Sequence, residues 1–205
     1  TFFLTGVAFL YVLTGSLNIS DIAYQLGLIE NSRLEVAAIS FLFIGLAIKA
    51  GIVPLAGWLP RVYTYSPSFI AAFISGVSTK VALYLLAKVF YVLFGKDIAL
   101  GQFAFGDILI IVAVIGIFFG GIAACMQTNM RRLLAFSSLS NIGYIVLGIG
   151  IGSKLAIVGA VILFISHGLA KSGLFVVAGL CRNNMLGLYK SSALLAAFII
   201  LFGFS

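Results

Sequence analysis

Long apolar runs, separated by short polar segments, make up almost all of this chain. Because roughly 20 apolar residues form a helix that crosses a bilayer, the pattern predicts an all-α, polytopic transmembrane bundle of about seven spanning segments. They are expected at Thr1 to Ser16 (the end of a first helix), about Val36 to Lys49, Ser68 to about Phe94, about Phe105 to Met126, Leu133 to about Gly150, Leu155 to Leu180, and from near Ser191 onward.

Two stretches of the chain, one connection and one helix, have patterns of their own. Residues 17–35 hold a short interfacial helix that we expect Ser20 or Asp21 to cap. The helix that begins at Val36 is interrupted by glycines and prolines and resumes to about Leu59. The residues that break it are Gly51, Pro54, Gly57 and Pro60. Inside a membrane such backbone is tolerated only where protein or water satisfies it, and broken helices are typical of ion and substrate sites in transporters.

Composition places the chain in the membrane. It is 63% hydrophobic and only 8% charged, whereas a soluble domain has about 25% charged residues. The net charge of +7 would suggest a nucleic-acid partner in a soluble protein, but here Lys and Arg lie at helix ends, as membrane topology requires. One set of connections has basic residues and no acid, which predicts that it faces the cytoplasm: Arg61, Arg131, Arg132, Arg182 and Lys190.

Four basic residues do not fit this pattern because they fall near the middle of predicted helices. Lys49 lies about 13 residues into its helix, or ~20 Å at 1.5 Å per residue, and Lys80 is similarly deep. His167 and Lys171 are four residues apart and therefore share one helix face. A charge at this depth costs roughly 2.5–3.5 kcal/mol. A snorkelling or packing role fits Lys88 better, since it lies near a helix end.

These groups suit proton transfer. Burial disfavours the charged form of lysine while a nearby carboxylate favours it, and histidine already exchanges protons near neutral pH. All five acids lie at expected membrane edges, so the mid-membrane bases either stay largely neutral or pair with a carboxylate outside this chain. Polar residues beside these bases could hold water between them, namely Ser75, Ser78, Thr79, Ser137, Ser138, Ser140 and Asn141. The alternative, helix–helix packing by small polar residues, remains equally open.

The cysteines do not indicate a cofactor. Cys125 and Cys181 stand alone at helix ends, with no CxxC motif and no histidine at metal-ligand spacing. We therefore expect no metal, haem, cluster or flavin, and no redox chemistry in the chain itself. The chain starts at Thr1 without a methionine and ends at Ser205 within an apolar run, so we expect it to be an internal part of a longer protein.

Four signatures, in the correct order, resemble the proton-antiporter module family. They are FIGLAIKAGIVPLAGWLP at 43–60, SP at 66–67 with STKVALY at 78–84, NMRRLLAFSSLSNIGYIVLGIG at 129–150, and HGLAKSGLFVVAG at 167–179. The family includes antiporter-like membrane subunits of complex I, of membrane-bound hydrogenase-type complexes and of multisubunit cation/proton antiporters. The YTYSP and STKVALY versions are most similar to the antiporter D-type and hydrogenase branch.

The resemblance implies roles for particular residues. Lys49 would be the central lysine of a first half-channel and Lys80 the lysine that links it onward, while His167 and Lys171 would belong to the polar axis of the second half. It also implies two inverted repeats, with residues 1–94 ending the first and 105–205 beginning the second. The acidic partner of Lys49 and a second broken helix would lie outside this chain. Arg61 departs from the family, which usually has an acid there and a histidine soon after.

The resulting hypothesis is an ion-translocating subunit in the cell (inner) membrane of a prokaryote. It would conduct H⁺, or exchange H⁺ with Na⁺, and would assemble with other membrane subunits of an NADH dehydrogenase-like or hydrogenase-like complex, which would supply the energy. Two alternatives remain. A secondary transporter for a small solute would need a cavity lined with aromatic or ion-pairing residues, and a purely structural subunit would be insensitive to substitution of Lys49 and Lys80.

Overall fold

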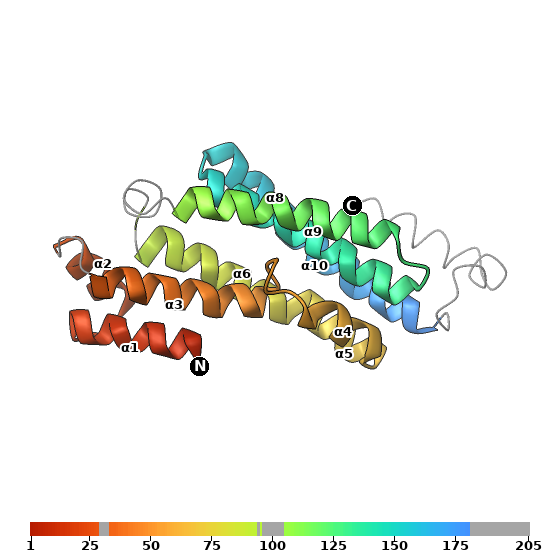
Figure 1. Cartoon of the computed structure of the whole chain (residues 1–205), viewed down its shortest axis with the longest axis horizontal. Coiled ribbons are helices and arrows are strands. Elements are labelled where there is room, and N and C mark those ends of the chain that lie inside the picture. Colours follow the sequence, from red (N-terminus) through yellow and green to blue (C-terminus); the bar gives the residue numbers. More distant parts are fainter. Residues whose placement is uncertain (29–32, 94, 96–104, 181–205) are drawn as a thin grey trace.

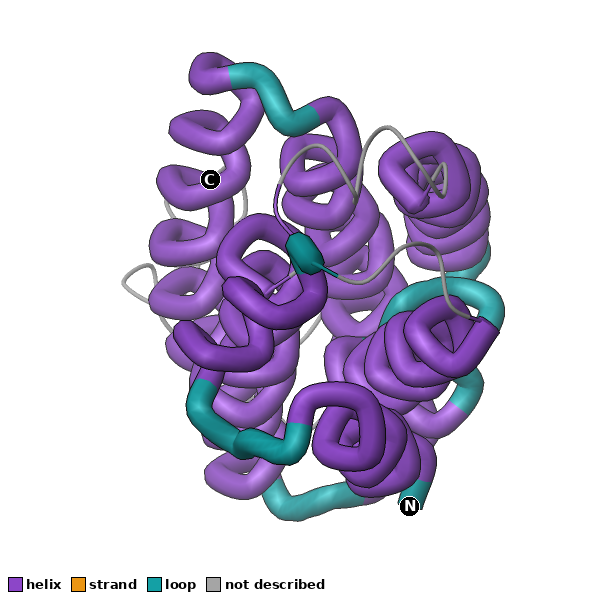
Figure 2. Tube along the Cα trace, turned by 90° about the vertical axis from the view of Figure 1, so that its left-hand side faces the viewer, coloured by secondary structure: helices purple, strands orange, loops and turns teal. Residues whose placement is uncertain are grey.

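The computed structural model describes residues 1–28, 33–93, 95 and 105–180, and all regular structure in these ranges is helical. The long helices lie side by side, nearly parallel to the long axis of the molecule (Figures 1 and 2). The helical elements, long and short, are α1 (Phe2–Thr14), α2 (Ile19–Leu26), α3 (Arg33–Ala50), α4 (Trp58–Tyr65), α5 (Ser68–Phe73), η1 (Ile74–Ser78), α6 (Thr79–Lys88), η2 (Val89–Leu93), α8 (Phe105–Cys125), α9 (Met130–Ile151) and α10 (Lys154–Leu180).

Four continuous stretches of the described chain are long and apolar enough to cross a membrane, namely Ser68–Leu93, Phe105–Cys125, Met130–Ile151 and Lys154–Gly179. The pair α1 and α2, bent by 62°, provides a fifth if it is one span. Helix α3 falls outside this set because it includes Arg33, Glu35 and Lys49. The polytopic all-helical fold is therefore confirmed with fewer spans than the seven expected. The segment expected from near Ser191 lies outside the described residues.

The predicted helix break is present, and its backbone groups are largely satisfied. Helix α3 ends at Ala50 with Gly51 at φ +77°, a conformation that favours glycine. The N–H groups of Gly51 and Ile52 return to the carbonyls of Ile48 and Ala47, at 3.3 and 3.0 Å. This is the double hydrogen bond of a Schellman motif. The Trp58 indole N–H donates to the Ile48 carbonyl at 2.8 Å and ties the start of α4 to the end of α3.

Beyond the break, α4 continues to Tyr65, which is further than the predicted end near Leu59. Pro60 lies in the first turn of α4, where a missing N–H removes no helical hydrogen bond. Pro54 lies within the loop and follows a cis peptide bond. The short helix α2 was correctly predicted, but its N-cap is Asn18 and not Ser20 or Asp21, since the Asn18 side chain accepts from the Ser20 N–H.

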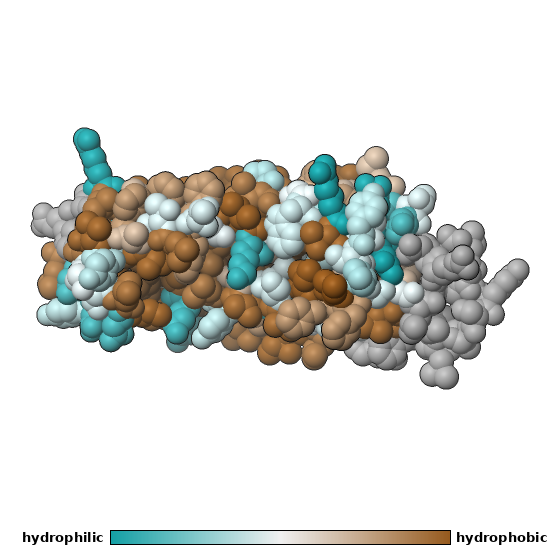
Figure 3. All heavy atoms as spheres, turned by 90° about the horizontal axis from the view of Figure 1, so that it is seen from below, coloured by the Kyte–Doolittle hydropathy of each residue, from teal (hydrophilic) through white to brown (hydrophobic). Residues whose placement is uncertain are grey.

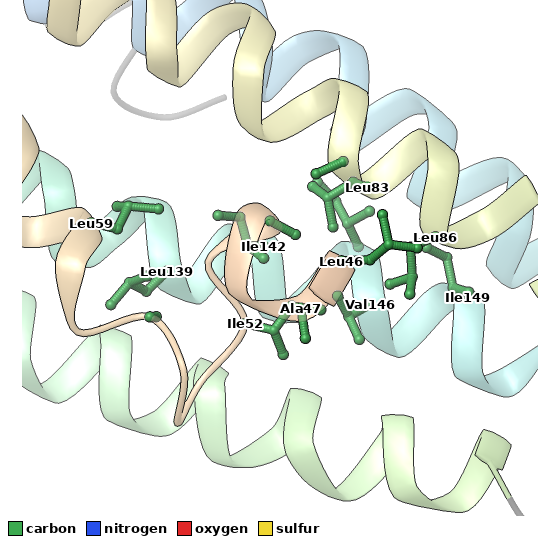
Figure 4. Close-up of a cluster of buried hydrophobic side chains, with 14 of the residues drawn as sticks. Leu46, Ala47, Ile52, Leu59, Leu83, Leu86, Leu139, Ile142, Val146 and Ile149 are labelled. Carbon is green, nitrogen blue, oxygen red and sulfur yellow. The ribbon is translucent and has the colours of Figure 1, made fainter. Parts of the chain in front are cut away.

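The core surrounds the break. Leu46 and Ala47 from the end of α3 pack with Leu83 and Leu86 of α6, and Ile142 of α9 lies against them (Figure 4). All of these side chains are buried. The broken helix is thereby fixed between α6 on one side and α9 on the other, so its two halves keep a defined position near the middle of the molecule.

Arg131 connects the two parts of the bundle at one end. Its guanidinium donates to the Ser66 carbonyl at 3.2 Å and to the Ser68 hydroxyl at 2.7 Å, so the start of α9 holds the turn between α4 and α5. Gly179 of α10 contacts Ser68 so closely that a Cβ would overlap its hydroxyl. The turn after α4, the start of α9 and the last turn of α10 therefore lie at one end of the bundle, as the charge pattern predicts for Arg131. Arg182 and Lys190 lie outside the described residues.

The outer surface is strongly apolar. The face in Figure 3 is mostly hydrophobic, with isolated polar residues between the apolar ones. Helix α8 exposes Ile111, Ile115, Phe118 and Ile122, and α10 exposes Leu155 and Leu169. Contiguous apolar surface of this extent is unstable in water, and lipid or further helices would cover it.

Replacing Gly120 by alanine should destabilise the bundle. A Cβ at Gly120 would lie 2.5 Å from the Ser140 backbone nitrogen and 2.9 Å from the Phe136 carbonyl oxygen, so α8 and α9 would have to separate. We expect a loss of roughly 1–3 kcal/mol, measured as a lower Tm of the detergent-purified complex. Gly159→Ala is the matched control because nothing lies within 4 Å of its Cβ position, and there alanine should be neutral or stabilising. Equal Tm values for the two variants would contradict this packing.

Candidate functional site

Lys80 begins the second half of an interrupted helix. Between α5 and α6, residues Ile74–Ser78 form a π-helical segment, and the Thr79 N–H bonds back five residues to the Ile74 carbonyl. Wide turns of this kind are rare and occur frequently at functional sites. Here the Lys80 amino group donates to the Ser75 carbonyl at 2.8 Å. The segment therefore folds the lysine side chain back along its own helix.

The structure brings Lys80 directly to His167, although the two residues are 87 positions apart. The Lys80 Nζ lies 2.7 Å from His167 Nδ1. Lys80 is only 5% exposed and His167 2% exposed. An amine and an imidazole nitrogen at this distance need one donor and one acceptor, so the contact holds a single proton between two bases. The second ring nitrogen, His167 Nε2, is buried and has no hydrogen-bond partner among the described residues.

Lys171 continues the line toward α9. It is 7% exposed, and its Nζ donates to the Ser137 hydroxyl at 2.5 Å. Ser137 in turn donates to the Leu134 carbonyl at 3.0 Å. His167 and Lys171 thus share one face of α10, as predicted, and connect α6 with α9.

The two helices approach closely where η1 crosses α10, since a Cβ at Gly76 would lie 3.0 Å from the Ser172 hydroxyl. Gly76 in η1 and Gly168 in α10 face each other, and a Cβ at Gly168 would lie 3.5 Å from both the Gly76 carbonyl oxygen and Lys80 Cε. Beside the crossing, a largely apolar groove of about 640 Å³ runs between α5, η1 and α10 and reaches Lys80. The close approach of the two backbones is what lets a lysine on one helix reach a histidine on the other.

Lys49 has a different environment. It lies in the last turn of α3 and is exposed, and no hydrogen bond involves its side chain within the described part of the chain. The structure therefore does not join Lys49 to the Lys80 line by direct contact. Next to the break, a cavity of about 430 Å³ is lined by Pro54, Pro60 and Arg61, and by Phe119 and Phe136 from α8 and α9.

The predicted polar residues divide into two groups. Thr79 and Ser138 are buried and donate back to their own helices, Thr79 to the Ser75 carbonyl at 3.3 Å and Ser138 to the Leu134 carbonyl at 2.8 Å. Ser78 and Asn141 are half-buried. Ser137 is the member of this set whose side chain contacts a mid-membrane base, and the roles of the others remain predictions.

Sequence reasoning missed Tyr63. This tyrosine of α4 is 1% exposed, and its ring packs on Phe175 of α10 with the ring centroids 4.8 Å apart. Helical spacing could have indicated its burial, because Leu59 and Tyr63 are four residues apart and share the buried face of α4. The tyrosine lies between the predicted helix end near Leu59 and the helix expected from Ser68, in a stretch for which the sequence pattern predicts no helix.

No group of three metal-ligating side chains occurs in the described residues. Cys125 is free and exposed, and Cys181 lies outside them. The site is thus built from amine, imidazole and hydroxyl groups inside a helical membrane bundle. Such a fold and site define a polytopic helical membrane protein with protonatable side chains buried between its helices.

The particular family follows from sequence comparison. The family model described as "NADH:quinone oxidoreductase/Mrp antiporter, TM" matches residues 1–205. The chain belongs to this family, which confirms the resemblance seen in its sequence.

Relatives include subunits of NADH-quinone oxidoreductases and of Na(+)/H(+) antiporters. The chain is 42% identical over 178 residues to NADH-quinone oxidoreductase subunit N of Desulforudis audaxviator (strain MP104C), covering 87% of this chain and 35% of the relative. It is 38% identical over 178 residues to an Na(+)/H(+) antiporter subunit of Alkalihalophilus pseudofirmus (strain ATCC BAA-2126 / JCM 17055 / OF4), covering 86% and 35%. The chain therefore spans about a third of the length of these curated relatives.

A solved structure has the same arrangement of helices. In the membrane-bound sulfane sulfur reductase, an archaeal respiratory membrane complex, one chain superposes with a TM-score of 0.87 at 28% identity. The match covers all of this chain (100%) and 43% of that chain. The antiporter-like fold of the described residues is thus shared with part of a multisubunit membrane complex.

Ser137→Ala should leave the Lys171 amino group without its acceptor. An amino group that loses its partner in a buried position costs roughly 1–3 kcal/mol, so we expect a lower Tm of the purified complex. Ser140→Ala is the matched control on the same helix, because Ser140 bonds only to a carbonyl, that of Ile117, at 3.2 Å. A Tm change for Ser137→Ala no larger than that for Ser140→Ala would show that the Lys171 contact contributes little.

Proposed function

We propose that this chain is part of an antiporter-like membrane subunit that translocates protons along Lys80, His167 and Lys171. The observation that carries the proposal is the 2.7 Å contact between Lys80 Nζ and His167 Nδ1, both buried in the middle of spanning helices. Burying two bases in a membrane is costly, and such residues are seldom found there without a functional role. Proton transfer uses such a pair directly.

The contact favours a step in which one proton displaces another. Two protonated bases at this distance would place donor against donor, so the pair holds one shared proton at a time. A proton that reaches Lys80 would therefore be passed to His167, and a second arrival would drive the first onward. The unpartnered His167 Nε2 is the point from which that proton would leave, toward an acceptor or a water molecule.

The donor set favours H⁺ over Na⁺ at this point of the path. Amine and imidazole nitrogens bind protons strongly, whereas hard cations prefer oxygen ligands. Exchange of H⁺ with Na⁺ remains the alternative, because a named relative is an Na(+)/H(+) antiporter subunit. Measuring the transport of H⁺ and of Na⁺ in the same vesicles identifies which ion is moved.

The wider setting belongs to the same proposal. The subunit would lie in the cell membrane of a prokaryote, with the Arg61 and Arg131 end in the cytoplasm, and would assemble with other membrane subunits of a redox-driven complex or a cation/proton antiporter. The driving energy would reach it through those partners. Residues 1–94 would end one inverted repeat and residues 105–205 begin the next, and the Arg131 contact with Ser66 and Ser68 would join the two.

Lys80→Met tests the proposal. Methionine keeps an unbranched side chain of similar length but cannot carry a proton, so proton translocation by the full-length subunit in its complex should fall by at least about tenfold. Inverted membrane vesicles with a pH-sensitive dye and tracer Na⁺ report both ions while the driving reaction is followed. Lys88→Met is the matched control, since Lys88 is a half-buried lysine in the last turn of the same helix. Full transport in Lys80→Met vesicles would refute the function.

Lys49→Ala addresses the other half of the predicted path. Because Lys49 is exposed and unbonded in the described residues, its removal should leave the fold and assembly intact. We expect ion movement in the same vesicles to be lost, and the ion that stops identifies the cargo. Unchanged movement of both ions would remove Lys49 from the path without affecting the assignment of Lys80.

A further inference from the structure

The cavity beside the helix break is separate from the line of bases. Its volume of about 430 Å³ is within the range of pockets that hold small molecules. One wall is the break itself, from Val53 to Pro60, and the other is formed by Phe119 of α8 and Phe136 of α9. These two rings meet edge to face, with centroids 6.3 Å apart. The walls are therefore mostly apolar, and Arg61 is the one charged residue among the described residues that line them.

Two arginines without a partner lie beside this cavity. Arg61 lines it and is exposed. Arg132 is also exposed and lies four residues before Phe136, so it shares that face of α9 one turn, or ~6 Å, nearer the start of the helix. Neither guanidinium has a hydrogen bond or an ion pair within the described part of the chain. The cavity thus combines apolar walls with two cations that can bind an anion.

The described acids lie far from these arginines. Asp21 is in α2, Glu35 is in the first turn of α3, and Asp107 is in the first turn of α8. Asp107 is 18 residues before the end of α8 at Cys125, or ~27 Å along the axis. Figure 1 shows α2 and α4 toward opposite ends of the molecule. Any counter-charge for Arg61 therefore comes from outside the described residues.

The depth of the cavity suits a phospholipid. Phe119 lies six residues before the end of α8, or ~9 Å along the axis, and the interfacial layer of a bilayer is roughly 5–8 Å thick on each side. Phe119 is 52% exposed on the apolar face of α8, so an acyl chain can reach it from the membrane. A phosphate nearer the helix end would meet the guanidinium groups, whose fork of donors matches phosphate oxygens.

We propose that this cavity binds an anionic phospholipid, with its phosphate between Arg61 and Arg132 and the start of an acyl chain against Phe119 and Phe136. Two cations without a nearby acid favour a headgroup of net negative charge over a zwitterionic one. A carboxylate of a partner subunit would neutralise the arginines but leave the apolar cavity unfilled, whereas a phospholipid satisfies both parts. The bound lipid would cover the helix break and tie α4 to α9. This site does not depend on the path that protons take.

The experiment places a fluorescent reporter in the cavity. The complex with full-length subunit carrying Phe119→Trp is reconstituted in vesicles of phosphatidylglycerol and phosphatidylcholine, in which one lipid at a time has brominated acyl chains that quench tryptophan. The signal of the complex without the reporter is subtracted. The relative binding constant should favour phosphatidylglycerol by roughly 25-fold, about fivefold for each arginine near the membrane surface. Phe118→Trp is the matched control: it is 65% exposed at the adjacent position and does not line the cavity, so it should show no preference.

Arginine substitutions then connect the preference with the site. In the Phe119→Trp background, Arg61→Gln and Arg132→Gln should each lower the preference for phosphatidylglycerol by roughly fivefold, and the double variant should abolish it. Arg33→Gln is the matched control, because Arg33 is an exposed arginine at the start of α3, beside the described acids. It should leave the preference unchanged.

Three outcomes would overturn the proposal. The first is equal quenching by the two lipids, and the second is a preference that survives the double arginine variant. The third is no quenching by either lipid, which would show that protein covers the cavity. Should Phe119→Trp prevent assembly of the complex, Phe136→Trp on the facing wall is the second reporter. A preference that depends on both arginines, with either reporter, supports the lipid site.

Discussion

The contact between Lys80 and His167 is the constraint on which the rest of this structure depends. Each of these two buried bases has the other as a hydrogen-bonding partner, and this requires their helices to approach closely. At Gly76 a Cβ would lie 3.0 Å from the Ser172 hydroxyl, so η1 and α10 are close there, and Lys80 lies just after the π-helical segment. The position of α10 against α5 and α6 is therefore set by polar chemistry as well as by packing, which is unusual where lipid removes the hydrophobic drive for association.

The helix break solves a related problem of satisfying polar groups. A broken backbone exposes carbonyls and N–H groups that lipid cannot satisfy. Here the Schellman bonds at Gly51 and the Trp58 indole cap the end of α3, and the apolar core of Figure 4 encloses the break. The break is thus a defined element of structure. It places the end of one half-helix and the start of another near the middle of the bundle, where helix dipoles act on nearby charges.

Sequence predicted most of the described helices, the break and the burial of Lys80, His167 and Lys171, because each depends on local pattern. Lys49, expected near the middle of its helix, lies exposed in the last turn of α3. It did not predict the direct contact of Lys80 with His167, which depends on how α10 crosses η1. The π-helical segment has no recognised local pattern, and Asn18 prevailed as a cap because its side chain reaches the Ser20 N–H. Tyr63 was missed because it falls after the predicted helix end near Leu59, whereas the structure buries it within α4.

Lys80 and Lys49, the two lysines assigned to the proposed path, differ in their environments. Lys80 is buried and bonded, whereas Lys49 is exposed and has no partner in the described chain. Where α3 and α6 meet, Leu46 and Leu83 form an apolar layer (Figure 4). A proton cannot cross such a layer without water or a moving side chain. Transfer between the two lysines would then be intermittent, and a step that admits water there would control the coupling of one half of the path to the other.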